Sequence, residues 1–289
     1  MVDRRDLTTI RPLPRAPQTI DRNTDFRHTL LTMQRSGFHA WNFVIVRTTA
    51  YTPASNDAFR SFMDRLHTEA AKGVTWMPTL STVYKDPAIA PCLLPLIRWT
   101  VLEDPSLAGL DVEQATRRFD DWRAGVSVER DGEGADHVAV RIGAVARFRY
   151  FVIVDDEALE SSSVGGMKVR VVDAGRPLGC EIFYGMSPEE TATRDRERQE
   201  REEKERAEWE VRRQMAAGDE DEENENEEED EGEDLQNEHE LVEGCARWDV
   251  GWMWVEAEYL SRFYEIVMAD SGWDNYYVRP PKIYPRDSF

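Results

Sequence analysis

Arginine and aromatic residues within apolar segments are the groups in this sequence best suited to bind a ligand. Arg47 lies at the end of the apolar segment 41–48, and the segment 146–154 carries two more arginines. Guanidinium groups bind carboxylates and phosphates through paired hydrogen bonds, and aromatic rings can form the apolar wall of such a pocket. If these segments pair as strands, we expect a pocket for a small anion that is lined by Arg47, Arg147, Arg149, Tyr150, Trp252 and Trp254.

A second interpretation of the arginines needs no ligand. Arg141, Arg147 and Arg149 stand at odd positions of a segment whose even positions are apolar, and Arg170 belongs to a later segment. In an antiparallel sheet this alternation places one row of side chains in the core and the other row in water. The arginines are then ordinary solvent-facing residues, which is the simpler of the two interpretations.

Residues 11–17, RPLPRAP, have the pattern R-x-x-P-x-x-P. In a polyproline II helix, Pro14 and Pro17 lie one turn apart and fit the aromatic grooves of an SH3 domain, while Arg11 meets an acidic pocket. Short proline patterns are also common in flexible arms. An SH3 domain is therefore one expected partner, and a plain linker is the alternative.

One acidic block dominates the charge of the chain. Residues 219–240 contain fifteen Asp and Glu and neither Lys nor Arg, and without them the formal net charge changes from −21 to −6. A block of like charges repels itself and resists folding. Because affinity for nucleic acid comes largely from Lys and Arg, a nucleic-acid partner is not expected. The simplest interpretation is a solvated insertion. If the block binds a partner, we expect a basic protein such as a histone, and a further alternative is that it covers the arginines of its own chain.

Familiar catalytic and metal-binding patterns are missing from the sequence. The histidines, at 28, 39, 67, 137 and 239, are never spaced HxH or HxxxH, and DEGED at 230–234 lacks the ligand spacing of an EF-hand. No G-x-S-x-G, Walker A or G-x-G-x-x-G pattern occurs. We therefore expect no cofactor, and the sequence leaves open whether the protein is an enzyme.

Cysteine spacing and the first residues of the chain indicate a cellular compartment. Three widely separated cysteines, at 92, 180 and 245, favour reduced thiols over a disulfide framework. The first residues are rich in Arg and Asp and lack the apolar core of a secretory signal. The best apolar run, around Cys92, is too short and too rich in proline to cross a membrane. We expect a soluble protein of the cytoplasm or nucleus with no membrane partner.

Periodicity predicts the elements that would position these residues. Strands are expected at 41–48, 138–154, 168–173, 180–184 and 251–256. Helices are expected from Ser55, as the cap, to a stop at Gly73, briefly within 93–102, from a capping box of Asp111 and Gln114 to Gly125, and over 257–270 with a stop at Gly272.

The change in composition after residue 186 predicts the domain layout. We expect a disordered arm at 1–37, a single α+β domain made of 38–186 and 244–285, a charged solvent-exposed helix at 187–217, and a disordered acidic insertion at 218–243. The domain is expected to contain a mixed or antiparallel sheet with two or three packed helices, and a ferredoxin-like topology is one form that fits.

Four segments together resemble a group of uncharacterised proteins from filamentous fungi. They are WNFVIVRT, the helix with D-x-E-Q and F-x-x-W, RYFVIVD, and the closing GWMWVE with W-x-x-YYVRPP. The resemblance spans most of residues 40–285 and implies a shared α+β domain. It implies no activity and no catalytic residue at any position.

Two functional hypotheses follow from these observations. The first is a non-enzymatic interaction protein whose acidic block recruits a basic partner. The alternative is an enzyme or binding protein for a small anionic metabolite, which would use the arginine and aromatic pocket.

Overall fold

The structure of this protein is a computed structural model, and its residues form two compact units. The first unit comprises residues 1–176 and 249–289, and the second comprises 177–248. The described residues are 26–76, 89–135, 145–164, 166–175, 239–243, 245, 248–269 and 271–287.

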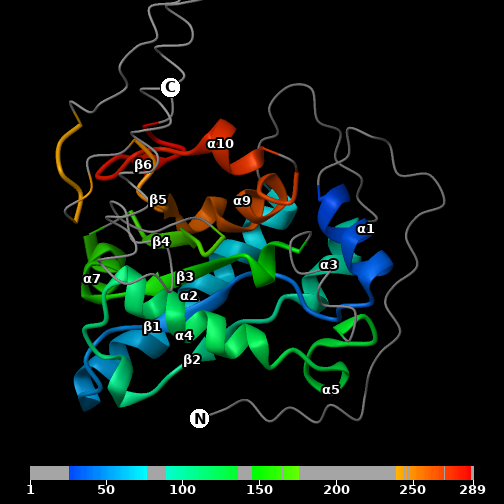
Figure 1. The fold of residues 1–289 in the computed structure, drawn as a ribbon, viewed down its shortest axis with the longest axis horizontal. Coiled ribbons are helices and arrows are strands. Elements are labelled where there is room, and N and C mark those ends of the chain that lie inside the picture. Colours follow the sequence, from blue (N-terminus) through cyan, green and yellow to red (C-terminus); the bar gives the residue numbers. More distant parts are fainter. Residues whose placement is uncertain are drawn as a thin grey trace, which may run out of the picture. The chain divides into compact units, whose positions relative to one another are not determined.

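A six-stranded mixed sheet forms the centre of the first unit (Figure 1). Its strands are β1 (Val44–Arg47), β2 (Thr100–Leu102), β3 (Tyr150–Val154), β4 (Lys168–Asp173), β5 (Trp252–Glu256) and β6 (Ile283–Tyr284). The order across the sheet is β2-β1-β3-β4-β5-β6. β1 runs parallel to β2 and β3, β4 runs antiparallel to β3 and β5, and β6 runs parallel to β5.

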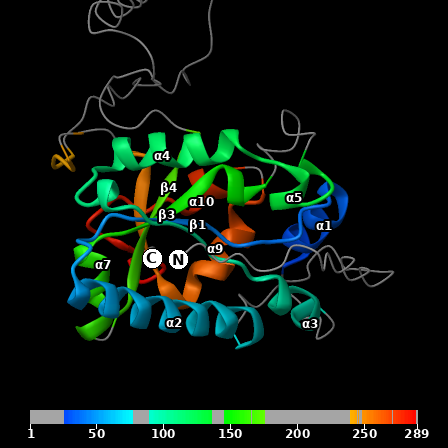
Figure 2. The same cartoon turned by 90° about the horizontal axis from the view of Figure 1, so that it is seen from below.

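Helices cover both faces of the sheet. The α-helices of the described residues are α1 (Arg27–Ser36), α2 (Pro53–Trp76), α3 (Ile89–Leu93), α4 (Val112–Ala124), α5 (Val128–Asp131), α7 (Asp156–Val164), α9 (Leu260–Ile266) and α10 (Gly272–Tyr276). Short 3₁₀ helices are η1 (Leu94–Leu96), η2 (Pro105–Leu107), η5 (Ala146–Phe148) and η6 (Ala257–Tyr259). Figure 2 shows α4 on one face, with α2 and α9 on the other.

The topology makes this an α/β fold, so the α+β and ferredoxin-like predictions are wrong, although a mixed sheet is confirmed. The prediction of two or three packed helices is also wrong, because the described residues alone contain eight α-helices. Along the chain, α2 connects β1 to the parallel strand β2, and α4 lies in the connection from β2 to β3. All four residues of β1 are buried, as a central strand covered on both faces requires. β2 was missed because Thr100–Leu102 lies within the segment that was predicted to be a brief helix.

The ends of α2 differ from the prediction for physical reasons. Thr52 Oγ1 accepts a hydrogen bond from the Ser55 N–H at 3.2 Å, and Pro53 is the first helical residue, so Thr52 and not Ser55 caps the helix. Gly73 lies inside α2 instead of ending it. A Cβ at this position would lie 2.8 Å from the Glu258 carbonyl oxygen, so glycine allows α2 to approach η6 closely.

The predicted start of α4 is confirmed. Asp111 Oδ1 accepts from the Gln114 N–H at 2.8 Å, and Gln114 Oε1 accepts from the Asp111 N–H at 3.2 Å. Phe119 of this helix stacks on Phe151 of β3 with ring centroids 4.8 Å apart. The capping box therefore begins a helix whose aromatic stripe packs on the sheet.

The strand predicted at 138–154 is shorter in the structure. β3 begins at Tyr150, and residues 146–148 form η5. Ala146, Arg147 and Phe148 are all buried, so the alternation of apolar and polar residues there did not reflect two sides of a strand. Residues 138–144 lie outside the described part of the chain.

The disorder predicted for 1–37 is wrong for residues 26–37, which contain the whole of α1. Glu265 of α9 receives hydrogen bonds from the first turn of α1: Oε1 from His28 N at 2.8 Å, and Oε2 from Thr29 N at 2.8 Å and from Thr29 Oγ1 at 2.7 Å. Leu30 and Met33 are buried beneath the helix. The N-terminal capping group of α1 thus comes from residues more than 230 positions away in sequence, which local patterns cannot reveal.

Strands from both sides of the insertion belong to the same sheet. The predicted strands at 168–173 and 251–256 correspond to β4 and β5, which pair directly. The predicted strand at 180–184, the charged helix at 187–217 and the insertion up to residue 238 lie outside the described residues.

The described residues of the second unit form a small turn. Val242 and Cys245 exchange two backbone hydrogen bonds, of 3.0 and 2.9 Å. Glu243, at the turn, has a φ of 49°. Residues 242 and 243, at the end of the insertion predicted to be disordered, thus belong to a hydrogen-bonded turn.

Candidate functional site

The strand order points to the carboxyl end of β1 as the place where a ligand would be expected. Ligands of open α/β sheets bind beyond the carboxyl ends of parallel strands, where the connections diverge to opposite sides. Here α2 leads from β1 to β2, and α4 then returns across the other face to β3, which borders β1 on its opposite side. Arg47 is the last residue of β1 and lies at this point.

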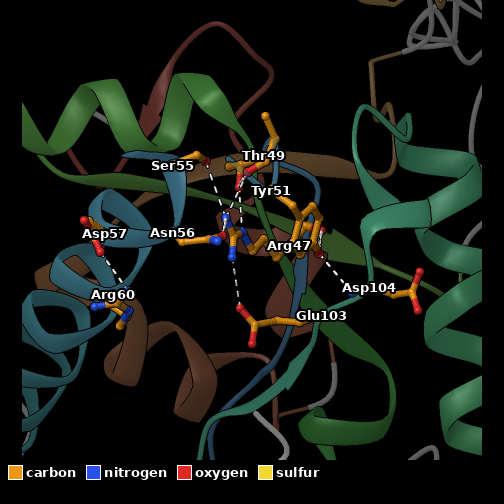
Figure 3. Close-up of polar contacts among 10 residues, drawn as sticks. Arg47, Thr49, Tyr51, Ser55, Asn56, Asp57, Arg60, Glu103 and Asp104 are labelled. Atoms are coloured by element: carbon orange, nitrogen blue, oxygen red, sulfur yellow. Dashed lines mark hydrogen bonds and ion pairs between the residues drawn. The ribbon is translucent and has the colours of Figure 1, made fainter. Parts of the chain in front are cut away.

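The Arg47 guanidinium lies within a cluster of hydrogen-bond acceptors (Figure 3). Nε donates to Thr49 Oγ1 at 2.7 Å, and Nη1 donates to Glu103 Oε1 at 3.2 Å. Nη2 donates to Asn56 Oδ1 at 2.7 Å and to the Ala50 carbonyl at 2.9 Å. Arg47 thereby joins the end of β1 to the first turn of α2 and to the residue that follows β2.

Two aromatic rings enclose the same guanidinium. Its Cζ lies 4.3 Å from the ring centroid of Tyr51 and 4.5 Å from that of Phe59. The Tyr51 hydroxyl donates to the Arg47 carbonyl at 3.2 Å and accepts from the Asp104 N–H at 3.0 Å, and burial raises the pKa of Tyr51. The Arg47 side chain is 4 % exposed. Its donors are thus directed at protein acceptors, as a buried cation requires, so the guanidinium stabilises the fold and offers little surface to an external anion.

Arg147 lies at the opposite end of β1. Its Nη1 donates to the carbonyls of Asn42 and Arg98, both at 3.0 Å, and its Nη2 donates to Thr100 Oγ1. These acceptors precede or begin β1 and β2, so Arg147 lies near the amino ends of these strands. The residue is buried, and burial lowers the pKa of its guanidinium.

Arg149 forms a bidentate ion pair with Asp173. Arg149 Nε lies 3.0 Å from Asp173 Oδ1, and Nη2 lies 2.8 Å from Oδ2. Asp173 is buried, and its hydrogen bonds raise the pKa of Arg149. Tyr150, the next residue, is also buried and stacks on Trp273 at 5.5 Å.

Trp252 and Trp254 of β5 lie on the opposite face of the sheet from Tyr150. Tyr150 is opposite Asp173, whereas Trp252 is opposite Val172, and consecutive residues of β4 point to opposite faces. Lys168 and Arg170 stack on these tryptophans: Arg170 Cζ lies 4.1 Å from the Trp252 ring, and Lys168 Nζ lies 4.0 Å from the Trp254 ring.

The six residues predicted to line an anion pocket therefore do not come together. Arg47 lies at the carboxyl end of β1, Arg147 at its amino end, and the remaining residues are divided between two faces of the sheet. The solvent-facing interpretation does not describe Arg47 or Arg147 either, since both are buried. Arg141 and the SH3-ligand candidates Arg11, Pro14 and Pro17 lie outside the described residues.

Metal-binding clusters and membrane-spanning helices are both absent from the ranges that the structure describes. These residues contain no group of three or more His, Cys, Asp or Glu side chains arranged to hold a metal ion. None of the helices in these ranges has the length and apolar character needed to cross a lipid bilayer.

The partners of the buried arginines were missed by sequence reasoning. Glu103 directly follows β2, and Asn56 lies in the first turn of α2. The position of Glu103 directly after a strand was a usable signal in principle, because polar residues that follow parallel strands meet at one edge of the sheet. The contact between Arg47 and Glu103 could not be predicted from it, since Thr100–Leu102 was predicted to be part of a helix and not a strand.

Comparisons with protein-family models, with curated proteins and with solved structures give no match.

Proposed function

We propose that this protein is a non-enzymatic interaction protein that presents its acidic block, residues 219–240, to a basic partner from a firmly folded α/β unit. The observation that supports this proposal most strongly is the pairing of β4 with β5. β4, which precedes residues 177–248 in the chain, and β5, which follows them, are adjacent antiparallel strands. The acidic block thus belongs to a loop whose two ends are held side by side.

Contacts at the two ends of this loop are numerous. Asp173 N donates to the Gly251 carbonyl at 3.0 Å, and Asp173 Oδ1 accepts from Gly175 N at 2.9 Å. Arg149 pairs with Asp173 through its side chain and accepts from Ala174 N at 2.9 Å through its carbonyl. Because loop-closure entropy rises only logarithmically with length, a fold held in this way tolerates a long insertion at small cost.

The placement of the arginines argues against the alternative function. A small-anion site needs donors that converge on a space open to a ligand. Arg47 and Arg147 direct their donors at internal acceptors and lie at opposite ends of β1. The acidic block remains the strongest chemical feature of the chain, and its fifteen carboxylates would attract Lys and Arg of a partner over a distance set by the salt concentration.

A binding experiment with three proteins tests the proposal. The proteins are the wild type, a deletion of 219–240, and a full-length variant in which the fifteen acidic residues of this block are replaced by Gln and Asn. A purified histone serves as the basic probe. We expect the wild type to bind it, both variants to lose binding, and salt at about 0.5 M to weaken the complex strongly. Equal binding of all three proteins would show that the acidic block is not the recruiting element.

A further inference from the structure

Leu241 and Trp248 stand out because they are both large and exposed. Their side chains are 71 % and 55 % exposed, and in the part of the chain that the structure describes they are the large hydrophobic residues classed as exposed. Both residues follow the acidic block closely in sequence.

A turn separates the two residues. The hydrogen bonds between Val242 and Cys245 close it, so that Leu241 precedes the bridge and Trp248 follows it. The ring of Trp248 also contacts His239, with centroids 5.2 Å apart. These contacts restrict the segment, so presenting Leu241 and Trp248 to a partner costs less conformational entropy than ordering a flexible chain would.

The surroundings of the two residues are acidic. Glu240 and Glu243 are both exposed in the same short segment. A tryptophan supplies a large contact area and is enriched among residues that dominate binding energy. Exposed apolar side chains with acidic neighbours fit a partner that offers apolar contacts with basic neighbours.

We propose that Leu241 and Trp248 are the apolar anchor of the partner-binding surface, and that the partner is a basic amphipathic segment carrying Lys or Arg together with apolar side chains. This inference rests on the proposed function and specifies the chemistry of the partner. The carboxylates would accelerate the encounter, and the apolar anchor would slow dissociation.

Two peptides distinguish the apolar contacts of Leu241 and Trp248 from the electrostatic attraction of the acidic block. They are fluorescently labelled, of equal length and equal lysine content, with Leu at the remaining positions in one and Ser in the other. The proteins are the wild type, the double variant Leu241→Ala and Trp248→Ala, and the conservative double variant Leu241→Ile and Trp248→Phe. The fourth is the full-length variant in which the fifteen acidic residues of 219–240 are replaced by Gln and Asn (the charge-neutral variant). Because both native side chains are exposed, we expect the melting temperature of the alanine variant to match that of the wild type.

The alanine variant is expected to bind the Lys/Leu peptide about tenfold more weakly than the wild type and to bind the Lys/Ser peptide equally well. The conservative variant should retain most of the affinity. If the alanine variant binds the Lys/Leu peptide as tightly as the wild type while the charge-neutral variant binds neither peptide, the anchor is disproved and the proposed function stands. If the wild type binds neither peptide, both proposals fail.

Nuclear magnetic resonance gives a second readout. The chain has nine tryptophans, and the indole N–H signal of Trp248 is identified by its loss in Trp248→Phe. This signal should shift on addition of the Lys/Leu peptide and stay in place with the Lys/Ser peptide. A signal that responds equally to both peptides would contradict an apolar anchor.

Discussion

Single residues in this protein act mainly by joining elements that are distant in sequence. Arg47 contacts Glu103, 56 positions further along the chain. Glu265 receives hydrogen bonds from Thr29, which lies 236 positions earlier in the sequence. Both charged groups are buried. A buried charge is costly unless it is paired or hydrogen-bonded, so the loss of either partner is expected to destabilise the fold.

Replacing Arg47 with alanine is expected to lower the free energy of unfolding by about 3 kcal/mol, because the change removes a buried ion pair and leaves several acceptors without a donor. Chemical denaturation measures the effect. Arg60→Ala is the matched control on α2, since its pair with Asp57 is exposed and both residues appear in Figure 3. The control should change stability by less than about 0.5 kcal/mol. Similar losses for the two variants would contradict the structural role of Arg47.

Glu265 gives a pH-dependent prediction. Burial raises the pKa of this carboxyl above its ordinary value of 4.5, although hydrogen bonds from Thr29 and His28 act in the opposite direction. A raised pKa in the folded state means that the contribution to stability is complete below 4.5 and is lost as the pH rises through the folded-state pKa.

Glu265→Gln removes this titration and thereby isolates it. The stability of the wild type relative to Glu265→Gln should therefore decrease as the pH is raised from 4.5 towards neutrality. Denaturation curves of both proteins over this range provide the measurement. A difference that does not change with pH would show that the ionisation of Glu265 is not linked to folding.

At the scale of elements, close contacts between helices decide which residues are tolerated. Gly73 lies within α2 against η6, and a Cβ at this position would approach the Glu258 carbonyl to 2.8 Å. The contact partner is backbone and cannot move away as a flexible side chain would. The general preference of helices for alanine over glycine is therefore expected to be reversed here.

Gly73→Ala should lower the melting temperature, with a cost of about 1 to 3 kcal/mol from overpacking. Thr68→Ala on an exposed position of the same helix is the control, and we expect it to be neutral or slightly stabilising because of helix propensity. Stabilisation by Gly73→Ala would mean that α2 and η6 are not in close contact. Scanning calorimetry of the two variants distinguishes these outcomes.

For the whole molecule, the main feature is an α/β unit built from two stretches of the chain. β5 and β6 come after the insertion, yet β5 pairs with β4 along five residue pairs. The sheet thus depends on residues from both sides of 177–248, and a backbone hydrogen bond joins Asp173, before that segment, to Gly251, after it.

Replacing residues 177–248 with a short Gly/Ser linker should therefore leave the first unit folded. We expect a single cooperative unfolding transition, because the linker joins strands that are already adjacent and closing a shorter loop costs less entropy. Circular dichroism and thermal denaturation test this expectation. Separate transitions for 1–176 and 249–289 would contradict the shared sheet.

The sequence alone determined those features of this protein that depend on nearby residues. Asp111 and Gln114 form the predicted capping box, the apolar residues of β1, β4 and β5 form strands, and the acidic block is evident from composition. These features depend on spacing within a few residues, where backbone geometry fixes which side chains meet.

Tertiary structure decided the strand directions, the partners of the arginines and the cap of α1. Periodicity identifies a buried segment but carries no information on which distant segment lies beside it, so an α+β fold and a shared arginine pocket were plausible until β2 and the order of the sheet were known. The hydrogen bonds of Arg147 to Asn42 and of Glu265 to Thr29 join residues 105 and 236 positions apart. Such pairs are set by chain packing, because a buried charge selects whichever acceptors or donors the complete fold brings to it.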